Sequence, residues 1–413
     1  MKFLINGGRE LHGKVEIEGA KNAVLPIMAG AILCDGEVKL KNAPHITDVW
    51  NMISILNHLG AKVSFDGGVA IDACGVASIL IPTELSQKLR ASILLLGALL
   101  GRFKHARITY PGGCDIGLRP IDLHLKAMRE LGVVVKESHG VLNCDATNLH
   151  GGVVVLDYAS VGTTENLILL CANGRESVTL VNVAREPEVV DLCNFLNRSG
   201  ANIIGAGTSE IVIHPVGKLV GIEYEVIKDR IVAGTYLLAG AITGGEVEVC
   251  GVEPQYLTSL LKKLCQSGCF LYVNGDKIKL KSCKTLKSVG FMETNVYPAF
   301  PTDLQAQFLV LQAVSKGDCV VKENVFESRF RFVLELIKMG AKITVDGRMA
   351  FVEGGRLSGA EVWATDLRGG AALILAGLNA SGYTKVYNAE YVLRGYENID
   401  KKLLSLGAEI KLI

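Results

Sequence analysis

One loop of the sequence combines a thiol, several glycines and a fixed positive charge. The segment YPGGCDIGLRP covers residues 110–120 and follows a predicted strand. The glycines before Cys114 relax the backbone, so this loop could open and close over a ligand. Arg119 favours the thiolate form of a nearby thiol, whereas Asp115 opposes it. The local sequence leaves two interpretations of Cys114 open, a chemical role and a small buried hydrophobe.

Basic residues recur where predicted strands lead into helices. Lys21 opens an otherwise apolar helix, where an ammonium group opposes the helix dipole unless an anion binds there; the alternative is a solvated lysine. Arginines stand at comparable turns, at Arg90, Arg329, Arg368 and Arg394. One such arginine is most often a surface residue, but their repetition in a chain of net charge +1 predicts a shared cleft. Because guanidinium groups pair with carboxylate and phosphate, the cleft would bind a small polyanion such as phosphoenolpyruvate.

Acidic and hydroxyl side chains stand at other helix starts. Asp303 in FPTDLQAQF and Asp366 in WATDLR each fit ordinary helix capping. A carboxylate in an arginine-lined site can also accept a proton from a hydroxyl, which favours a chemical role for Asp303. Residues 160–162, with the sequence SVG, suit the phosphates of a nucleotide, although N-capping explains them equally well. His124 fits a structural or substrate-orienting role better than a catalytic one.

A repeated unit positions these residues. A phrase of the form LGAKV, in which a helix ends at a glycine in the left-handed conformation and a strand follows, recurs six times. Its glycines lie about seventy residues apart, at Gly60, Gly132, Gly200, Gly268, Gly340 and Gly407. Each unit also contains an apolar helix that leads into an alternating strand, as in GAILCDGEVKL. Six units of this size account for the whole chain.

The two kinds of helix predict the architecture. A helix that is apolar on every side must be surrounded, whereas an amphipathic helix lies on a sheet facing water. Three units around one axis, with their apolar helices inward, would make one lobe, and six would make two. An open solenoid is the alternative, but solenoid repeats are usually shorter and have atypical ends. We therefore predict a two-lobed α/β protein.

Composition excludes several classes. The near-neutral charge gives no reason to expect binding to nucleic acid or to an anionic membrane. No leader-like segment opens the chain, and its longest apolar runs are too short for a membrane span. Eleven scattered cysteines fit reduced thiols in a cytoplasm. Cys265 and Cys269 are followed by no second ligand pair, so we predict no metal site.

Several motifs, matched in order along the whole chain, resemble the family of UDP-N-acetylglucosamine 1-carboxyvinyltransferases, which are enolpyruvyl transferases. They are GAKNAVLPIMAGAIL, LRASILLLG, PGGCDIGLRPIDLH, SVGTTEN, AREPEVVD, KDRIVAGTYL, YPAFPTDLQAQF, FESRF, ATDLRGGAALILAGL and RGYENI. The resemblance implies two inside-out α/β barrel lobes, each with threefold pseudo-symmetry. One lobe would contain residues 21–227 and the other residues 1–20 and 228–413, with a two-stranded hinge near 20 and 228.

The resemblance also implies roles. Cys114 matches a general acid that can form a covalent adduct, and Asp303, Lys21 and Arg394 match catalytic residues. Lys21, Arg119 and Arg394 would hold phosphoenolpyruvate, with Arg329 and Arg368 completing the cage. The other substrate-binding positions, mainly for the UDP-sugar, are Asn22, Arg90, Pro120, Ile121, Asp122, Leu123, His124, Ser160, Val161, Gly162, Asp303, Val325 and Asp366.

The implied reaction is an addition followed by an elimination. The sugar 3-hydroxyl loses its proton near Asp303 and attacks the enol carbon, while the methylene group takes a proton from Cys114. Inorganic phosphate then leaves the tetrahedral ketal. No cofactor is implied, and alkylation of Cys114 by the epoxide fosfomycin is expected. The sequence does not indicate an oligomeric state.

The chain departs from the family pattern at three positions. Val232 replaces a carboxylate, and Tyr391 and Leu393 occupy positions that are usually His and Asp. These changes leave a catalytically weak or inactive UDP-sugar-binding paralogue as an alternative. A shikimate-phosphate enolpyruvyl transferase is a second alternative, although the loop containing Cys114 favours the UDP-sugar branch.

Overall fold

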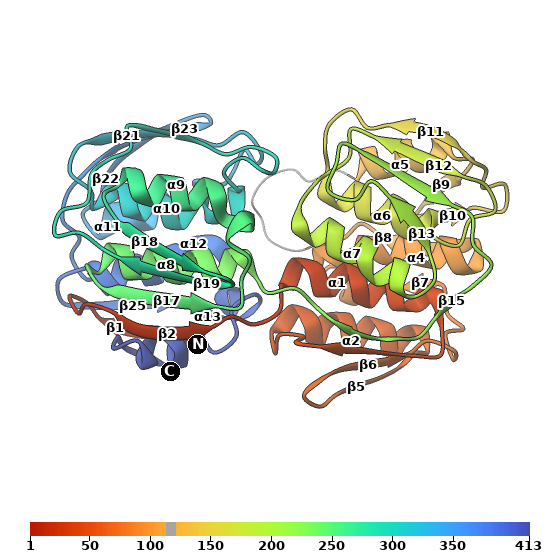
Figure 1. Cartoon of the computed structure of the whole chain (residues 1–413), viewed down its shortest axis with the longest axis horizontal. Helices are drawn as coiled ribbons and strands as arrows, with labels where there is room; N and C mark the ends of the chain where they lie inside the picture. The colour runs from red at the N-terminus through yellow and green to blue at the C-terminus, as the bar shows by residue number, and fades with distance from the viewer. Residues whose placement is uncertain (113–120) are drawn as a thin grey trace. The chain divides into compact units, whose positions relative to one another are not determined.

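The chain forms two compact units in a computed structural model that describes residues 1–112 and 121–413 (Figure 1). We call them the terminal unit, which contains Met1–Glu18 and Lys228–Ile413, and the middle unit, which contains residues 19–112 and 121–227. The chain therefore passes from one unit to the other after Glu18 and again after Ile227.

The middle unit contains three four-stranded sheets and one two-stranded sheet. In spatial order the strands are β7 (Leu80–Ile81), β8 (His105–Thr109), β10 (Val141–Asp145) and β9 (Val134–Ser138); β11 (Gly152–Val155), β12 (Val178–Val181), β14 (Glu210–His214) and β13 (Asn202–Ile204); β16 (Glu223–Glu225), β4 (Glu37–Lys41), β6 (Gly68–Asp72) and β5 (Lys62–Phe65); and β15 (Leu219–Val220) with β3 (Cys34–Asp35). The helices are α1 (Lys21–Gly30), α2 (Thr47–Leu59), α3 (Thr83–Ser86), α4 (Leu94–Phe103), α5 (Asp122–Glu130), α6 (Val161–Cys171) and α7 (Pro187–Arg198), with 3-10 turns η1 (Ala31–Leu33) and η2 (Arg90–Ile93).

The terminal unit contains three four-stranded sheets. They are β24 (Glu361–Trp363), β25 (Tyr383–Tyr387), β1 (Lys2–Asn6) and β26 (Glu409–Leu412); β18 (Phe270–Asn274), β19 (Lys277–Lys281), β17 (Glu246–Cys250) and β2 (His12–Glu16); and β20 (Phe291–Glu293), β21 (Asp318–Lys322), β23 (Met349–Glu353) and β22 (Lys342–Asp346). The helices are α8 (Arg230–Ile242), α9 (Thr258–Gln266), α10 (Gln305–Ala313), α11 (Val333–Lys338), α12 (Leu367–Asn379), α13 (Ala389–Leu393) and α14 (Ile399–Ser405), with 3-10 turns η3 (Pro254–Leu257) and η4 (Thr302–Leu304).

Every four-stranded sheet has the same pairing pattern. One edge strand is parallel to its neighbour, and the remaining pairs are antiparallel. The first strand of the chain, β1, lies between β25 and β26. With helices and sheets alternating along the chain, the predicted α/β class is confirmed.

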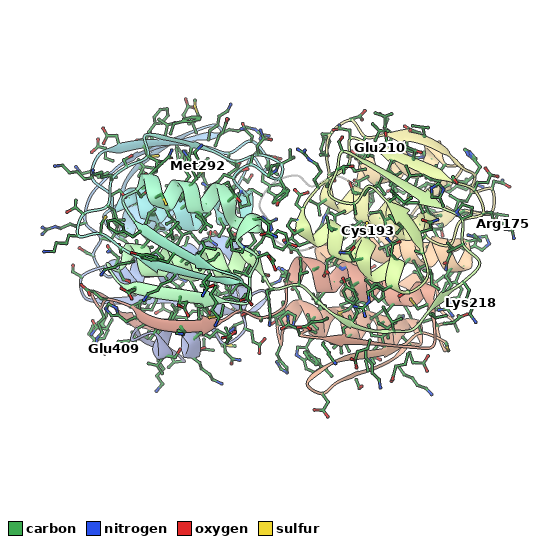
Figure 2. The ribbon with its side chains drawn as sticks, viewed as in Figure 1. Arg175, Cys193, Glu210, Lys218, Met292 and Glu409 are labelled. Carbon is green, nitrogen blue, oxygen red and sulfur yellow. The ribbon has the colours of Figure 1, made fainter. Side chains whose placement is uncertain are left out.

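Three helices form the centre of each unit. Almost every residue of α4 and α6 is buried, and both pack with α1 in the middle unit. In the terminal unit α8 and α10 are buried at every position and α12 at nearly every one, and the three pack on one another (Figure 1). In the middle unit the charged side chains of Arg175, Glu210 and Lys218 point outward, as Figure 2 shows, whereas Cys193 is fully buried.

The predicted left-handed conformation of the six repeat glycines is confirmed. A left-handed residue lets a helix end and its chain turn back onto the sheet, and glycine adopts this conformation without a Cβ clash. Their φ angles lie between 88° and 113° at Gly60, Gly132, Gly200, Gly268, Gly340 and Gly407.

Backbone hydrogen bonds lie beside both points at which the chain passes from one unit to the other. Within the middle unit Ala20 N donates to the Ile227 carbonyl at 2.7 Å, and within the terminal unit Asp229 N donates to the Glu18 carbonyl at 2.9 Å. The Glu18 carboxylate also accepts a hydrogen bond from the Lys402 ammonium group. Among the described residues no helix is long and apolar enough to cross a membrane.

Candidate functional site

The terminal unit holds the Asp303 carboxylate between two buried arginines. Asp303 lies in η4, Arg329 precedes α11, and Arg368 lies at the start of α12. Arg329 Nη2 is 2.6 Å from Asp303 Oδ1, and Arg368 Nη2 is 2.9 Å from Asp303 Oδ2. Both guanidinium side chains are 3% exposed, whereas the carboxylate is 27% exposed. The structure thus brings three predicted residues, far apart in sequence, into one cluster.

The cluster keeps unused hydrogen-bond donors. Within the described part of the chain, Arg368 Nε and Nη1 and Arg329 Nε are buried and have no hydrogen-bond partner. Burial by itself lowers the pKa of Arg368, but the Asp303 carboxylate raises it above the usual arginine value. Two guanidinium groups share the Asp303 carboxylate, and the charge of Asp229 also acts on Arg368. Buried cationic donors without partners suit an anionic ligand.

Asp303 and Asp366 look alike in the sequence, and the structure separates them. Asp366 Oδ1 caps α12 by accepting from Arg368 N and Gly369 N, each at 3.0 Å. Its other oxygen accepts from Thr365 Oγ1 at 3.0 Å. Asp303 makes no capping hydrogen bond among those described and instead faces the arginines. Asp366 is therefore occupied in fixing the backbone that carries Arg368.

A buried polar network lies beside Arg368, and sequence reasoning missed it. The Arg368 guanidinium carbon lies 5.5 Å from the centre of the Tyr396 ring. The Tyr396 hydroxyl is 3.0 Å from Thr235 Oγ1 and accepts from Gln307 Nε2 at 3.0 Å. A glutamine and a threonine inside the apolar helices α10 and α8 were the available signal. Gln307 Oε1 is buried without a partner in the described chain, so this network also contains an acceptor atom that could take a further hydrogen bond.

Glu323 is a second functional candidate that the sequence did not reveal. Its side chain is fully buried, and Oε1 accepts from Val325 N at 2.8 Å and from Phe326 N at 3.0 Å. Oε2 accepts from Thr302 Oγ1 at 3.0 Å. Glu323 thereby joins the turn at Val325, a predicted substrate-binding position, to the residue before Asp303.

The three departures from the family pattern are packed as hydrophobic or half-buried groups. Val232 is fully buried in the first turn of α8, and its N–H donates to Asp229 at 2.9 Å. Tyr391 and Leu393 are partly buried against the apolar core of the terminal unit. Arg394 follows directly at the end of α13 and is half-buried.

In the middle unit Lys21 forms an ion pair. Lys21 Nζ lies 2.8 Å from Asp48 Oδ2, and the two side chains are 12% and 2% exposed. Lys21 is the first residue of α1, whose N-terminus has no side-chain cap, and Asn22 beside it is half-buried. Asp48 therefore compensates part of the conflict between the ammonium group and the helix dipole.

The start of α6 gathers other predicted middle-unit residues. Ser160 Oγ accepts from Thr163 N at 3.4 Å, so N-capping does occur here. A side chain at Gly162 would lie 3.4 Å from His124 Cε1. His124 and Leu123 are buried in α5, and Arg90, at the start of η2, is half-buried. Of the remaining predicted positions, Val161 is half-buried, Ile121 is buried and Asp122 is exposed.

Two buried acidic side chains of the middle unit, Glu165 and Asp191, have raised pKa values. Burial raises the pKa of Glu165 well above its ordinary value, and the nearby Glu188 and Glu186 raise it further. Burial also raises the pKa of Asp191 to about 6, although hydrogen bonds from Tyr224 and Ile227 lower it. No sequence pattern predicted either shift.

Several predicted features lie outside these clusters. Cys114, Arg119 and Pro120 lie outside the described residues. The described chain contains no group of three or more metal-ligating side chains.

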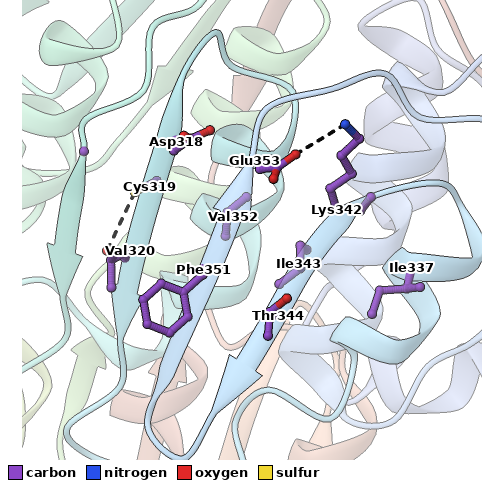
Figure 3. A pocket seen from close by; sticks show the side chains of 12 residues that line it. Asp318, Cys319, Val320, Ile337, Lys342, Ile343, Thr344, Phe351, Val352 and Glu353 are labelled. Carbon is purple, nitrogen blue, oxygen red and sulfur yellow. Dashed lines mark hydrogen bonds and ion pairs between the residues drawn. The ribbon is translucent and has the colours of Figure 1, made fainter.

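A pocket in the terminal unit is lined by β21, β22 and β23 and by Ile337 of α11 (Figure 3). Of the predicted site residues that the structure describes, none lines it, and Lys342 and Glu353 pair with each other there at 3.3 Å.

Comparisons with known proteins agree on one group of relatives. The family model described as EPSP synthase (3-phosphoshikimate 1-carboxyvinyltransferase) matches residues 5–403. The chain is 48% identical over 412 residues to UDP-N-acetylglucosamine 1-carboxyvinyltransferase 2 of Caldanaerobacter subterraneus subsp. tengcongensis, covering 99% of both chains. It is 47% identical over 413 residues to UDP-N-acetylglucosamine 1-carboxyvinyltransferase of Halothermothrix orenii, covering 100% of this chain and 99% of the relative. The crystal structure of the enolpyruvyl transferase NikO from Streptomyces tendae matches with a TM-score of 0.90 at 26% identity, over 99% of this chain and 98% of that one.

Proposed function

Since this chain belongs to the EPSP synthase family, we propose that it transfers the enolpyruvyl group of phosphoenolpyruvate to the 3-hydroxyl of UDP-N-acetylglucosamine and releases phosphate. This reaction would be the first committed step of peptidoglycan synthesis, and so of cell-wall biogenesis, cell shape and cell division. A cytoplasmic location is part of this proposal, because the scattered cysteines fit reduced thiols. The observation that carries the proposal is the Asp303 carboxylate held by two buried arginines with spare donors.

We further propose that six repeated units build two inside-out lobes, three units to a lobe. The lobes are residues 21–227 and residues 1–20 with 228–413, and the chain segments near 20 and 228 act as a hinge. Six four-stranded sheets with one pairing pattern and three buried helices in each compact unit support this arrangement. The hydrogen bonds at Ala20 and Asp229 support a two-stranded connection.

Basic residues bind phosphoenolpyruvate in this proposal. Lys21, Arg119 and Arg394 hold its phosphate and carboxylate, and Arg329 and Arg368 complete the cage. The buried guanidinium groups support it, because each charge-assisted hydrogen bond contributes about 1.5–3 kcal/mol. Anionic substrate groups would compete with Asp303 for the arginines and so release its carboxylate for chemistry.

Asp303 and Cys114 then move protons in opposite directions. Asp303 accepts the proton of the sugar 3-hydroxyl as that oxygen bonds to C2 of phosphoenolpyruvate, and Cys114 gives a proton to C3. In the second step the Cys114 thiolate takes a proton back from C3 as the bond between C2 and the phosphate oxygen breaks, and the phosphate leaves with the proton that Asp303 had accepted. General acid–base assistance of this kind contributes roughly 10²- to 10⁴-fold. The 27% exposure of the Asp303 side chain supports its role as base, because a hydroxyl group can reach the carboxylate.

The thiol of Cys114 is also the proposed site of fosfomycin alkylation. Burial raises the pKa of several other thiols and makes them poor nucleophiles: the pKa is about 11 for Cys34 and about 12 for Cys171 and Cys193. An epoxide should therefore select an accessible thiol with a basic neighbour.

The remaining predicted positions bind the UDP-sugar in this proposal. Ser160, Val161 and Gly162 lie at the start of α6, and His124 and Leu123 lie in α5. The other positions proposed on the UDP-sugar side are Asn22, Arg90, Pro120, Ile121, Asp122, Val325 and Asp366.

Acceptor choice tests the function. Phosphate release from phosphoenolpyruvate should require UDP-N-acetylglucosamine, and shikimate 3-phosphate should not replace it. Release with shikimate 3-phosphate alone would favour the other branch of the family. Tight binding of UDP-N-acetylglucosamine in calorimetry without any phosphate release would instead identify a regulatory paralogue.

A further inference from the structure

The carboxylate of Glu323 connects two segments of the terminal unit that are 21 residues apart in the sequence. Glu323 follows β21 directly, and its side chain is fully buried. One oxygen, Oε1, accepts from Val325 N at 2.8 Å and from Phe326 N at 3.0 Å. The other, Oε2, accepts from Thr302 Oγ1 at 3.0 Å. Three hydrogen bonds therefore fix this carboxylate between the turn after β21 and the start of η4.

Both segments lead to the ion pair between Asp303 and Arg329. Thr302 precedes Asp303 in η4, and its carbonyl accepts from Arg329 Nη2 at 3.2 Å. The same nitrogen donates to Asp303 Oδ1 at 2.6 Å. The Arg329 guanidinium carbon also lies 5.7 Å from the centre of the Phe326 ring. Glu323 thus holds the backbone beside the carboxylate through Thr302, and the turn beside the guanidinium group through Phe326.

The length of the Glu323 side chain suits a connection between segments. Side chains that accept from N–H groups two and three residues later usually belong to aspartate, asparagine, serine or threonine. Glutamate is one methylene group longer than aspartate, so its second oxygen can reach a donor outside the turn. A carboxylate only accepts hydrogen bonds, and its two oxygens have room for the three donors found here.

The backbone of η4 becomes more important when an anion binds. Arg329 and Arg368 hold the Asp303 carboxylate in the structure, and anionic substrate groups would compete for both arginines. Once the arginines turn to the substrate, the position of the Asp303 side chain depends on the backbone that carries it. Glu323 holds that backbone through Thr302 and donates no hydrogen bond to any anion.

We propose that Glu323 is a positioning residue for the base: by fixing Thr302 it sets the place and direction of the Asp303 carboxylate. The proposal rests on the proposed function for the role of Asp303 as base. Position matters because a displacement of about 1 Å in a catalytic site can lower the rate about 10²-fold.

Two substitutions at Glu323 separate the connection from the charge. Glu323→Asp keeps the charge and the acceptor for the turn, but its shorter side chain should lose Thr302. Glu323→Gln keeps the length, so its oxygen can accept from the turn while its NH₂ group donates to Thr302 Oγ1. We expect kcat to fall about 10- to 100-fold in Glu323→Asp and less than about threefold in Glu323→Gln, with the KM for phosphoenolpyruvate within about threefold in both. An unchanged kcat in Glu323→Asp, or an equal loss in Glu323→Gln, would overturn the proposal.

Thr302→Val tests whether the effect passes through the hydroxyl group. This variant keeps the shape of the side chain and removes the donor to Oε2. It should lower kcat about as much as Glu323→Asp, and the double variant should be no slower than either single variant. Losses of kcat that multiply in the double variant would show that Glu323 does not act through Thr302.

Glu335→Ala is the matched control for a loss of stability. Glu335 lies in the same unit, is 13% exposed and accepts from Trp363 N at 3.0 Å. Its replacement should lower the midpoint of urea unfolding without lowering kcat. If kcat fell as far in Glu335→Ala as in Glu323→Asp, destabilisation alone would explain the loss and the proposal would be wrong.

Crystal structures of the two Glu323 variants test the geometry without turnover. In Glu323→Asp the distance from Arg329 Nη2 to the Thr302 carbonyl should exceed about 3.5 Å, whereas in Glu323→Gln it should stay near 3.2 Å. The same distance in both variants would overturn the proposal even if kcat fell. If the parent protein released no phosphate but the two structures differed as expected, the proposed function would fail while the role of Glu323 in placing η4 would stand.

Discussion

Replacing Asp303 with asparagine should destabilise the terminal unit as well as abolish most activity. The carboxylate lies 2.6 Å from Arg329 Nη2 and 2.9 Å from Arg368 Nη2, and both arginines are 3% exposed. An asparagine side chain at this position would accept from one guanidinium group and turn an NH₂ group toward the other. The variant would therefore leave both buried guanidinium groups without the carboxylate that pairs with them.

The size of the loss follows from burial. Breaking a buried ion pair by removing one partner costs about 3–5 kcal/mol. Asp303 keeps 27% of its side chain exposed, which lets water compensate part of that loss. We therefore expect the free energy of unfolding to fall by about 3 kcal/mol. Phosphate release should fall by roughly 10²- to 10⁴-fold if Asp303 is the base.

Fluorescence can report on this unit alone. The chain has two tryptophans, and Trp50→Phe leaves Trp363, which stacks on Tyr387 at 5.0 Å between ring centres. Urea unfolding in that background should show the lower midpoint. Inorganic phosphate should stabilise Asp303→Asn more than the parent protein, because it can compensate the exposed arginine charge.

A matched control distinguishes burial from charge removal. Glu361 pairs with Lys385 at 2.7 Å in the same unit, but its side chain is 52% exposed. Glu361→Gln should lower stability far less than Asp303→Asn, because water screens an exposed ion pair. Equal losses in Glu361→Gln and Asp303→Asn would refute the account of the arginine cluster.

Three further perturbations have defined outcomes. Cys114→Ser should lose fosfomycin labelling in peptide mass spectrometry and most phosphate release; full labelling of that variant would contradict the assignment. Lys21→Met should raise the KM for phosphoenolpyruvate at least tenfold and destabilise the middle unit by about 2 kcal/mol, because Asp48 would remain buried without its cation. Urea unfolding and turnover measure both effects, and an unchanged KM would exclude Lys21 from the anion site. Asp191 has a pKa raised to about 6, so its contribution to stability is present below its unfolded pKa and is lost as the pH rises through 6. Between about pH 4 and pH 6.5 the stability of Asp191→Asn relative to the parent should therefore increase with pH, by up to roughly 3 kcal/mol, and a constant difference would contradict the shift.

The sequence predicted features that depend on local pattern. The positive φ of Gly60 and its five counterparts follows from a glycine between a helix and a strand. The buried helices follow from their apolar composition. The capping role of Asp366 was one of two predicted interpretations, and local sequence did not separate it from the arginine contacts of Asp303.

Polar contacts between distant segments were beyond sequence reasoning. Gln307 and Tyr396 are 89 residues apart, and Asn166 and His124 are 42 apart. A single polar residue in an apolar helix shows that a partner is needed but does not identify it. The position of β1 between β25 and β26 likewise depends on pairing of the two chain ends, which residue patterns alone do not specify.

The fate of one oxygen atom tests enolpyruvyl transfer most directly. Phosphoenolpyruvate labelled with oxygen-18 in the C2–O–P bridge can be incubated with UDP-N-acetylglucosamine, and the released phosphate analysed by mass spectrometry. Addition at C2 followed by loss of phosphate breaks the carbon–oxygen bond, so the phosphate should carry the label. Unlabelled phosphate would mean that the phosphorus–oxygen bond breaks, and would contradict the proposed reaction.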